Sequence, residues 1–475
     1  MDVNTTLAAS AIVQEILWAA GVFFLVYLIG YSTFQFLAVA TGASELYRRR
    51  REARYRNRTE LDCHVPVSIL VPAHNEGVTI VSSVRSLLSL DYSLFEVVVV
   101  DDGSTDDTSQ RLIEAFNLHA IDRPIRRQAP CREAEAVYFG RSGRVSITLV
   151  RKVNGGKADA LNMGINAARF PYFICIDADS VLQRDSLTEI VAPVIEDDSV
   201  VAVGGLVRPS NGVSFKDGQI GRHSMPRKVI PAMQVLEYDR SFLSARILFD
   251  QFNGNLIISG AFGLFRKDLV IAAGGYDVGT VGEDMEIVTR LHVFCRVNGI
   301  DYKIRYAPDA ICWTQAPETL GDLVRQRRRW HRGLLECMVK HARICCNPRF
   351  GLVGSISSLS FLVYELLSPV IEIAGLAITA LAALFGYINL PFMLMFLAIY
   401  AIFGAVMSLT AFASRVQTRD LSISAADMFR ALYLSVLEVT VLRFFMSFAR
   451  MTALFGYRRL AGGWESLKRS SIEVE

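Results

Sequence analysis

The sequence has little net charge and lacks the signatures of several common protein classes. Its 475 residues include 50 basic and 47 acidic ones, which leaves a net charge of +3. A nucleic-acid-binding protein would carry a strongly basic balance. We therefore expect no nucleic-acid partner.

The eight cysteines include no CxxC pair, and their spacing matches no zinc ribbon or zinc finger. Cys345 and Cys346 are adjacent, which is unfavourable for a disulfide between them. Cysteine usually behaves as a small buried hydrophobe. We expect reduced thiols in a cytosolic compartment.

Two nucleotide-binding signatures are also missing. Residues 154–162 read NGGKADALN and contain Gly-Gly-Lys, but they lack the GxxxxGK[ST] spacing of a P-loop. No GxGxxG follows the first predicted strand. These absences disfavour a P-loop ATPase and weaken any interpretation as a dinucleotide-binding protein.

Long stretches of the chain have almost no charge. Hydrophobic residues make up 52% of the chain and charged residues 20%, with a mean hydropathy of +0.31. Residues 11–40 contain only Glu15 as a charged residue, and residues 351–413 contain only Glu365 and Glu372. About 20 apolar residues suffice to cross a bilayer. The composition therefore predicts a soluble domain joined to membrane helices.

The flanking charges orient these segments. Residues 48–51 are four arginines, and the positive-inside rule places them in the cytoplasm. Pro369 predicts a kink in the span at 355–385, which is followed by a second span at 388–413. The stretch at 427–449 carries charges and precedes a basic tail, so we predict an interfacial or re-entrant segment but leave a full crossing open.

These features divide the chain into six parts. They are an N-terminal transmembrane helix (1–42), a basic cytosolic linker (43–60), a catalytic domain (61–335), an interfacial segment (336–350), C-terminal transmembrane or interfacial helices (351–455) and a cytosolic tail (456–475).

The soluble part has an α/β pattern. Residues 65–72 and 96–100 are short apolar runs rich in β-branched residues, and residues 79–90 between them have helical spacing. Further apolar runs occur at 145–150, 172–176 and 200–203. Strand, helix and strand in this order predict a parallel sheet, whose ligands bind beyond the carboxyl ends of the strands.

Acidic residues follow two of these strands. Asp101 and Asp102 could recognise a nucleobase or ribose, although a turn with a helix cap also explains them. Asp177 and Asp179 could converge on a divalent cation, although a polar turn is the simpler explanation of DxD alone.

Two further motifs lie nearer the C-terminal spans. Glu283 and Asp284 could supply a general base, the pKa of one carboxylate being raised by the other, or simply begin a solvated helix. Residues 326–330 read QRRRW. They could attract anionic lipid, or stabilise a diphosphate and stack on a sugar.

Each motif alone is weak, but their order is specific. The series VPAHNE, DDGSTDDT, GGKADALN, DADS, GED and QRRRW, with membrane segments on both sides, resembles the membrane-integrated glycosyltransferases of family 2. It is most similar to the processive synthases of poly-N-acetylglucosamine, cellulose, hyaluronan and chitin. A non-catalytic scaffold, the alternative class, would not need to keep Asp179, Asp284 and Trp330.

The resemblance implies an α/β GT-A (Rossmann-like) cytosolic domain flanked by transmembrane helices. It implies an inverting enzyme that uses a UDP-sugar, UDP-GlcNAc or UDP-glucose, to elongate a β-linked polysaccharide, coupled to export. Transfer of one sugar to a lipid or lipid-linked acceptor is the alternative, because few membrane spans are visible. The implied location is the inner (plasma) membrane, and the implied partners are the donor, a glycan or lipid acceptor, membrane lipid and accessory export subunits.

By similarity, individual residues receive roles. The nucleotide-sugar residues are Pro72, Ala73, Glu76, Asp101, Asp102, Lys157 and Asp177. Asp179 would bind Mg²⁺ or Mn²⁺, and Asp284, paired with Glu283, would be the general base. The acceptor and diphosphate residues are Gln326, Arg329 and Trp330, and residues 259–262 lie where an acceptor-contact segment is expected.

Four charged residues lie within or near the apolar spans. Intramembrane charges usually face the interior of a helix bundle and serve function. The alternative is that they pair with each other or reach the interface. These residues are Glu365, Glu372, Glu438 and Arg443.

Overall fold

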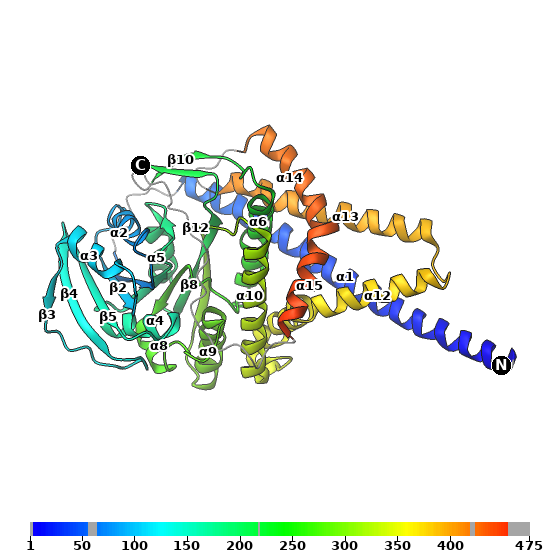
Figure 1. The fold of residues 1–475 in the computed structure, drawn as a ribbon, viewed down its shortest axis with the longest axis horizontal. Coiled ribbons are helices and arrows are strands. Elements are labelled where there is room, and N and C mark those ends of the chain that lie inside the picture. The colour runs from blue at the N-terminus through cyan, green and yellow to red at the C-terminus, as the bar shows by residue number, and fades with distance from the viewer. Residues whose placement is uncertain (1–2, 56–63, 217–218, 419–422, 455–475) are drawn as a thin grey trace.

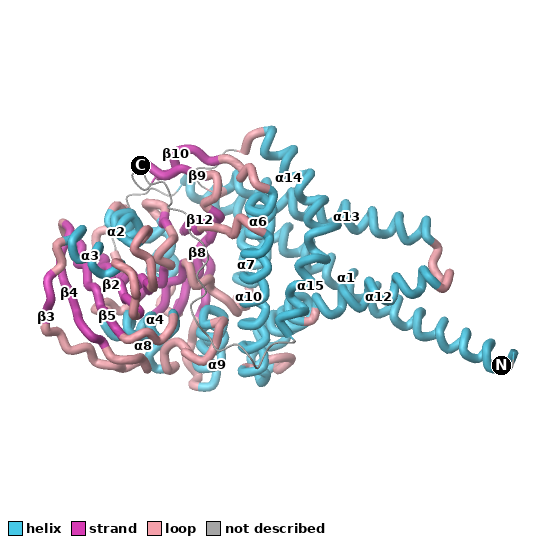
Figure 2. Tube along the Cα trace, in the orientation of Figure 1, coloured by secondary structure: helices cyan, strands magenta, loops and turns pink. Residues whose placement is uncertain are grey.

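A mixed ten-stranded β-sheet forms one end of the molecule, and long helices extend from the other end (Figure 1). The computed structural model describes residues 3–55, 64–216, 219–418 and 423–454. In Figure 2 the strands gather at one end, while the far end is helical. The prediction of an α/β domain, with long apolar helices before and after it along the chain, is confirmed.

The strands of this sheet are β1 (Val67–Ala73), β2 (Phe95–Asp102), β3 (His119–Ile121), β4 (Ala134–Ser142), β5 (Val145–Lys152), β6 (Tyr172–Ile176), β7 (Val181–Leu182), β8 (Val200–Pro209), β11 (Phe262–Arg266) and β12 (Lys303–Thr314). A separate hairpin is formed by β9 (Val213–Lys216) and β10 (Gln219–His223). The helices of the same part of the chain are α2 (Ile80–Leu88), α3 (Thr108–Phe116), α4 (Lys157–Ala167), α5 (Ser186–Glu196), α6 (Val229–Arg240), α7 (Arg246–Asp250), α8 (Lys267–Ala272), α9 (Glu283–Val297) and α10 (Leu320–Lys340).

The centre of the sheet is parallel. Its order is β3-β4-β5-β2-β1-β6-β11-β8-β12-β7, and β1 pairs in parallel with both β2 and β6. The apolar runs of the sequence are continuous because both faces are covered: Val97 and Val99 of β2 enter one core, and Val98 and Val100 enter the other. The predicted β1-α2-β2 unit is confirmed.

The register of the parallel strands brings their carboxyl ends level. Ala73 at the end of β1 lies opposite Asp101 of β2, and Asp101 lies opposite Arg151 of β5. Asp102 is likewise opposite Lys152. The segments that leave β1, β2 and β5 therefore emerge at one edge of the sheet.

A buried ion cluster forms at this edge. The Lys152 ammonium bonds to the Asp102 carboxylate, and it lies 2.7 Å from Asp159 Oδ1 on α4. The side chains of Lys152 and Asp102 are fully buried. Charges removed from water must be paired in this way to be tolerated.

The N-terminal helix α1 (Val3–Tyr55) is continuous over 53 residues. The basic stretch predicted as a linker at 43–60 continues this helix up to Tyr55. Glu45 explains this, because its carboxylate pairs with Arg48 at 2.7 Å and Arg49 at 2.8 Å on the next helical turn. Residues 56–63 lie outside the described part of the chain.

Three described helices are long and apolar enough to cross a membrane, or four if a bent pair counts as one span. The bent pair joins Val353–Leu366 to α12 (Ser368–Leu384) at 46°, which confirms the kink predicted at Pro369. The other candidates are in α1, in α13 (Leu390–Ala413) with the turn after it, and in Ala425–Leu454. The predicted tail at 456–475 lies outside the described residues.

The last candidate span comprises α14 (Ala425–Leu437) and α15 (Arg443–Leu454). In Figure 1 α14 and α15 run across α1, α12 and α13 rather than alongside them, and α15 contacts both α10 and α12. By length and composition Ala425–Leu454 qualifies as a crossing helix, the alternative left open in the sequence analysis.

Two of the four charged residues of the spans, Glu372 and Arg443, pair with each other, as one of the two alternatives expected. Arg443 Nη2 lies 2.6 Å from Glu372 Oε1 of α12, and it therefore joins α15 to α12. Glu438 pairs with Arg240 of α6 at 2.5 Å. Buried in apolar surroundings, such pairs hold the last helices against their neighbours.

Replacing Lys152 with methionine would leave Asp102 and Asp159 buried without their cation. We expect a loss of about 3 kcal/mol or more in the free energy of unfolding, because removing one member of a buried pair leaves an uncompensated charge. Thermal unfolding of the purified protein in detergent should show a lower midpoint. Lys303→Met, which removes a surface pair with Asp197, should leave the midpoint nearly unchanged. Equal midpoints for Lys152→Met and the original protein would contradict this prediction.

Candidate active site

The glycine turn before α4 is held by Asp102. The N–H of Gly155 donates to Asp102 Oδ1 at 2.9 Å, and the N–H of Gly156 donates to Oδ2 at 2.7 Å. Gly156 has a φ of +91°, a conformation that glycine adopts without strain. Helix α4 begins immediately afterwards with Lys157. Asp102 thus fixes the start of α4 and, with it, the backbone of Lys157.

Lys157 joins the acidic groups of two separate elements. Its Nζ donates to Asp177 Oδ1, just after β6, at 2.5 Å, and it lies 3.7 Å from Glu283 Oε1 of α9. Burial lowers the pKa of Lys157, but the carboxylates of Asp177 and Glu283 outweigh burial, and the net pKa lies above its usual value. Lys157 is therefore a fixed cation, and with 24% of its side chain exposed a ligand can reach it.

The acidic pair occupies the first turn of α9. The Gly260 N–H donates to Asp284 Oδ2 at 3.3 Å. A side chain at Gly260 would lie 3.3 Å from Lys157 Nζ and 3.5 Å from Asp284 Cβ, so the backbone of the 259–262 segment passes closely between them. Burial first and the neighbouring Asp284 second raise the pKa of Glu283, while Lys157 opposes them. The close pair predicted from GED is therefore present.

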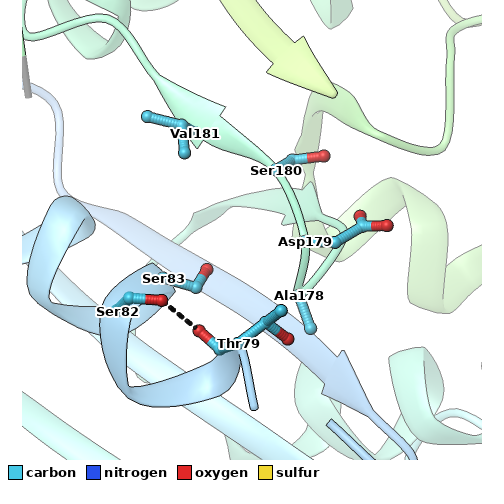
Figure 3. A pocket seen from close by; sticks show the side chains of 7 residues that line it. All are labelled: Thr79, Ser82, Ser83, Ala178, Asp179, Ser180 and Val181. Atoms are coloured by element: carbon cyan, nitrogen blue, oxygen red, sulfur yellow. Dashed lines mark hydrogen bonds between the residues drawn. The ribbon is translucent and has the colours of Figure 1, made fainter. Parts of the chain in front are cut away.

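Asp179 lies two residues beyond Asp177. Figure 3 shows it at the side of a small hollow between α2 and the segment after β6. The lining residues are Thr79, Ser82, Ser83, Ala178, Asp179, Ser180 and Val181. The volume of about 10 Å³ suits one water molecule. Burial and the nearby Asp177 raise the pKa of Asp179 to about 6.

This donor set fits a divalent cation. A carboxylate that is buried beside a second carboxylate is stabilised by a nearby positive charge. The described residues contain no group of three or more His, Cys, Asp or Glu placed to hold a metal by themselves. Mg²⁺ commonly needs only one or two carboxylates when substrate phosphates complete its coordination. Asp179 and Asp177 match that arrangement.

The other predicted nucleotide residues lie at the ends of β1 and β2. Pro72 and Ala73 are buried at the end of β1. Glu76 is also buried, and its carboxylate accepts from Thr79 Oγ1 at 2.9 Å. Asp101 Oδ1 accepts from the Ser104 N–H at 2.8 Å, and Oδ2 accepts from the Ser109 hydroxyl.

Helix α10 carries the QRRRW motif. Its spacing places Gln326, Arg329 and Trp330 on one helical face, because residues three and four apart are neighbours. Arg329 is exposed, and Trp330 is 44% exposed. No hydrogen bond reported for the described residues joins these three side chains to the carboxylates of β6 and α9. The structure therefore brings together Lys157, the two aspartates after β6 and the pair on α9. Within the described part of the chain, the contact of α10 with this group is made at Gly333, beside Gly282, and not by the three motif side chains.

The structure also identifies residues that the motifs did not. Arg327, the first of three consecutive arginines, is buried, pairs with Glu237 of α6 at 2.6 Å and lies 4.4 Å from the Trp330 ring centre. Three residues past Trp330, Gly333 touches the backbone of Gly282. The glycine within an otherwise bulky helix was the only sequence signal for this contact.

Comparisons with known proteins agree with this geometry. The model of "Glycosyl transferase family 2" matches residues 68–272, and that of "Glycosyl transferase family group 2" matches residues 172–413. Poly-beta-1,6-N-acetyl-D-glucosamine synthase of Staphylococcus epidermidis is 30% identical over 275 residues, which cover 58% of this chain and 56% of that protein. The synthase of Staphylococcus aureus (strain COL) is 28% identical over 320 residues, or 66% of each chain. The match thus spans less than two thirds of either relative.

A solved structure supports the fold. The mannosyltransferase of Pyrobaculum calidifontis, in complex with GDP-Man and Mn²⁺, aligns with a TM-score of 0.52 and 19% identity. The alignment covers 88% of this chain and 99% of the mannosyltransferase. The sheet is therefore a GT-A core, and the chain belongs to glycosyltransferase family 2.

Proposed function

We propose that the chain is an inverting glycosyltransferase that uses a UDP-sugar to elongate a β-linked polysaccharide at the membrane. The observation that carries the proposal is the meeting of Lys157, Asp177 and Asp179 with Glu283 and Asp284 at the carboxyl edge of the sheet. The similarity to poly-N-acetylglucosamine synthases favours UDP-GlcNAc over UDP-glucose. Transfer of a single sugar to a lipid is the competing outcome of the test.

The roles follow from the chemistry of each side chain. A sugar linked to a diphosphate is activated, but its leaving group carries negative charge that must be stabilised. Asp179, assisted by Asp177, would hold Mg²⁺ or Mn²⁺, which when bound supplies positive charge to the diphosphate. Lys157 adds a fixed cation beside the same carboxylates. The acceptor hydroxyl then needs a single base, because inversion requires no enzyme nucleophile.

Asp284 is the proposed base. The Gly260 N–H and the first turn of α9 hold its carboxylate, while Glu283 is turned toward Lys157. Pro72, Ala73, Glu76 and Asp101 would line the nucleotide end of the site.

The remaining assignments complete the proposal. Asp102 supports the turn that carries Lys157 rather than contacting the donor, since Lys152 and the glycine turn use its carboxylate. Gln326, Arg329 and Trp330 would contact the acceptor or diphosphate from α10. We place the catalytic domain, residues 61–335 with the rest of α10, in the cytosol at the inner membrane. Accessory export subunits would complete a path for the polymer.

The product decides between the two activities. Purified protein in lipid nanodiscs, supplied with radiolabelled UDP-GlcNAc and Mn²⁺, should form a polymer that remains at the origin of a thin-layer plate and is degraded by a hexosaminidase. Parallel reactions with UDP-glucose and GDP-mannose test the donor. A product that carries one sugar on a lipid would overturn polysaccharide synthesis but would leave the glycosyltransferase assignment intact.

Asp284→Asn should lower kcat by at least about 100-fold, because the amide cannot accept the acceptor proton. Glu283→Gln should lower kcat less than Asp284→Asn does. It should mainly raise the KM for the donor, since Glu283 neighbours Lys157. Initial rates of UDP release measure both effects. Unchanged turnover by Asp284→Asn would refute the base assignment, and Glu283 would become the candidate.

Asp179→Asn should weaken metal binding about tenfold or more, because it replaces a charged ligand with a neutral one. Electron paramagnetic resonance of Mn²⁺ titrated in the presence of UDP measures binding without turnover. Asp185→Asn, a change in the same segment beyond the hollow, is the control and should bind Mn²⁺ as the original protein does. Equal Mn²⁺ affinity for Asp179→Asn would exclude this residue as a ligand.

A further inference from the structure

The acidic pair of α9 depends on the short segment that precedes it. Gly282 is the N-cap residue of α9, and it offers no side-chain cap to the helix. Within residues 279–282, the Gly282 N–H donates to Thr280 Oγ1 at 3.2 Å, and Thr280 and Val281 are bound from α10. The positions of Glu283 and Asp284 follow from that of the segment, because both residues belong to the first helical turn.

Glu336 of α10 supplies the missing anchor. Its Oε2 accepts from the Val281 N–H at 2.9 Å and from Thr280 Oγ1 at 3.1 Å. Its Oε1 accepts from Arg332 Nε at 2.9 Å, one turn earlier on α10. The Glu336 side chain is only 12% exposed. One carboxylate therefore binds the backbone two residues before the acidic pair and is itself oriented by a cation.

The backbones of α9 and α10 meet at the same place. A Cβ built at Gly282 would lie 2.8 Å from Gly333 Cα, and one built at Gly333 would lie 2.8 Å from Gly282 Cα. No side chain fits between them. The contact brings Glu336, three residues after Gly333, within reach of Val281.

Packing alone does not hold this segment. A hollow of about 370 Å³ opens beside it, lined by Asp277, Gly279, Thr280, Arg332, Glu336, Val339 and Lys340. The hollow leaves residues 279 and 280 without close packing on that side. The hydrogen bonds of Glu336 and the backbone contact at Gly333 therefore restrict it.

We propose that Glu336 is a positioning residue for Asp284, acting through the Val281 backbone. The inference rests on the proposed role of Asp284 as the general base. It gives α10 two roles: Gln326, Arg329 and Trp330 are the proposed acceptor or diphosphate residues, and the turns after them hold the segment that carries the base. The acceptor-binding motif and the base are then set by one rigid element.

The test is a double-mutant cycle between Glu336 and Asp284, read as kcat and donor KM in nanodiscs with radiolabelled UDP-GlcNAc and Mn²⁺. Glu336→Ala should lower kcat about tenfold or more, since small misplacement of a catalytic group is costly. The donor KM should change less than kcat does, because Lys157 and Asp179 are untouched and only Glu283 on the donor side moves with the segment. Glu336→Gln, whose amide oxygen can still accept from the Val281 N–H, should recover most of the loss.

In the Asp284→Asn background, Glu336→Ala should lower kcat by less than about a further twofold, because the base that Glu336 positions is no longer present. An equal cost in both backgrounds would overturn the inference. Unchanged kcat for Glu336→Ala would also overturn it while leaving the proposed function standing, whereas unchanged kcat for Asp284→Asn would refute the base assignment itself.

Two controls separate positioning from stability. Glu318→Ala removes an exposed carboxylate beside the start of α10, paired with Lys228, and it should leave kcat unchanged. Thermal unfolding midpoints should be similar for Glu336→Gln and the original protein. If Glu336→Ala is too unstable to purify, Glu336→Leu takes its place in the cycle, and an equal loss in both Asp284 backgrounds remains the overturning result.

Discussion

The buried carboxylate of Asp102 is the interaction on which the site depends. It neutralises Lys152 inside the domain and accepts from the two N–H groups of the glycine turn. A charge in this position is tolerated only when paired and fully hydrogen-bonded. The pairing thus fixes the path from β5 to α4, and the direction in which Lys157 leaves the sheet follows from it.

The electrostatics of the site follow from that geometry. Lys157 stands among Asp177, Glu283 and Asp284, and Asp179 lies close by. Four carboxylates surround one ammonium, so the cluster carries excess negative charge and favours a divalent cation. A diphosphate would bring further negative charge, which such a cation and Lys157 would offset. Burial first and the neighbouring Asp177 second raise the pKa of Asp179.

Helix α10 connects this site to the membrane helices. On one side Gly333 and Glu336 touch the segment before α9. On the other side Arg327 pairs with Glu237 of α6, and α15 packs along the helix. Arg240 of α6 in turn pairs with Glu438. The charged residues of the apolar segments therefore bind the membrane part to the helix that borders the site.

The local pattern of the chain was enough to predict much of this protein. Tyr172–Ile176 was predicted with its observed bounds, because burial on both faces requires an uninterrupted apolar run. The bend at Pro369 and the acidic start of α9 likewise depend on neighbours in the sequence. The order of motifs indicated the family, which the comparisons confirmed.

Only the tertiary structure decided which of several similar residues is buried and which partner it contacts. Three consecutive arginines are indistinguishable in sequence, yet only Arg327 is buried, because only it faces Glu237, 90 residues earlier. Glu336 and Lys152 belong to no motif, and their partners lie 55 and 50 residues away. The helical continuation of α1 through its arginines was missed because a basic run signals cytoplasm but not backbone conformation. The periodicity of a sequence indicates whether a position is buried. It does not indicate the partner of that position, because the partner is brought into contact only when distant segments pack together.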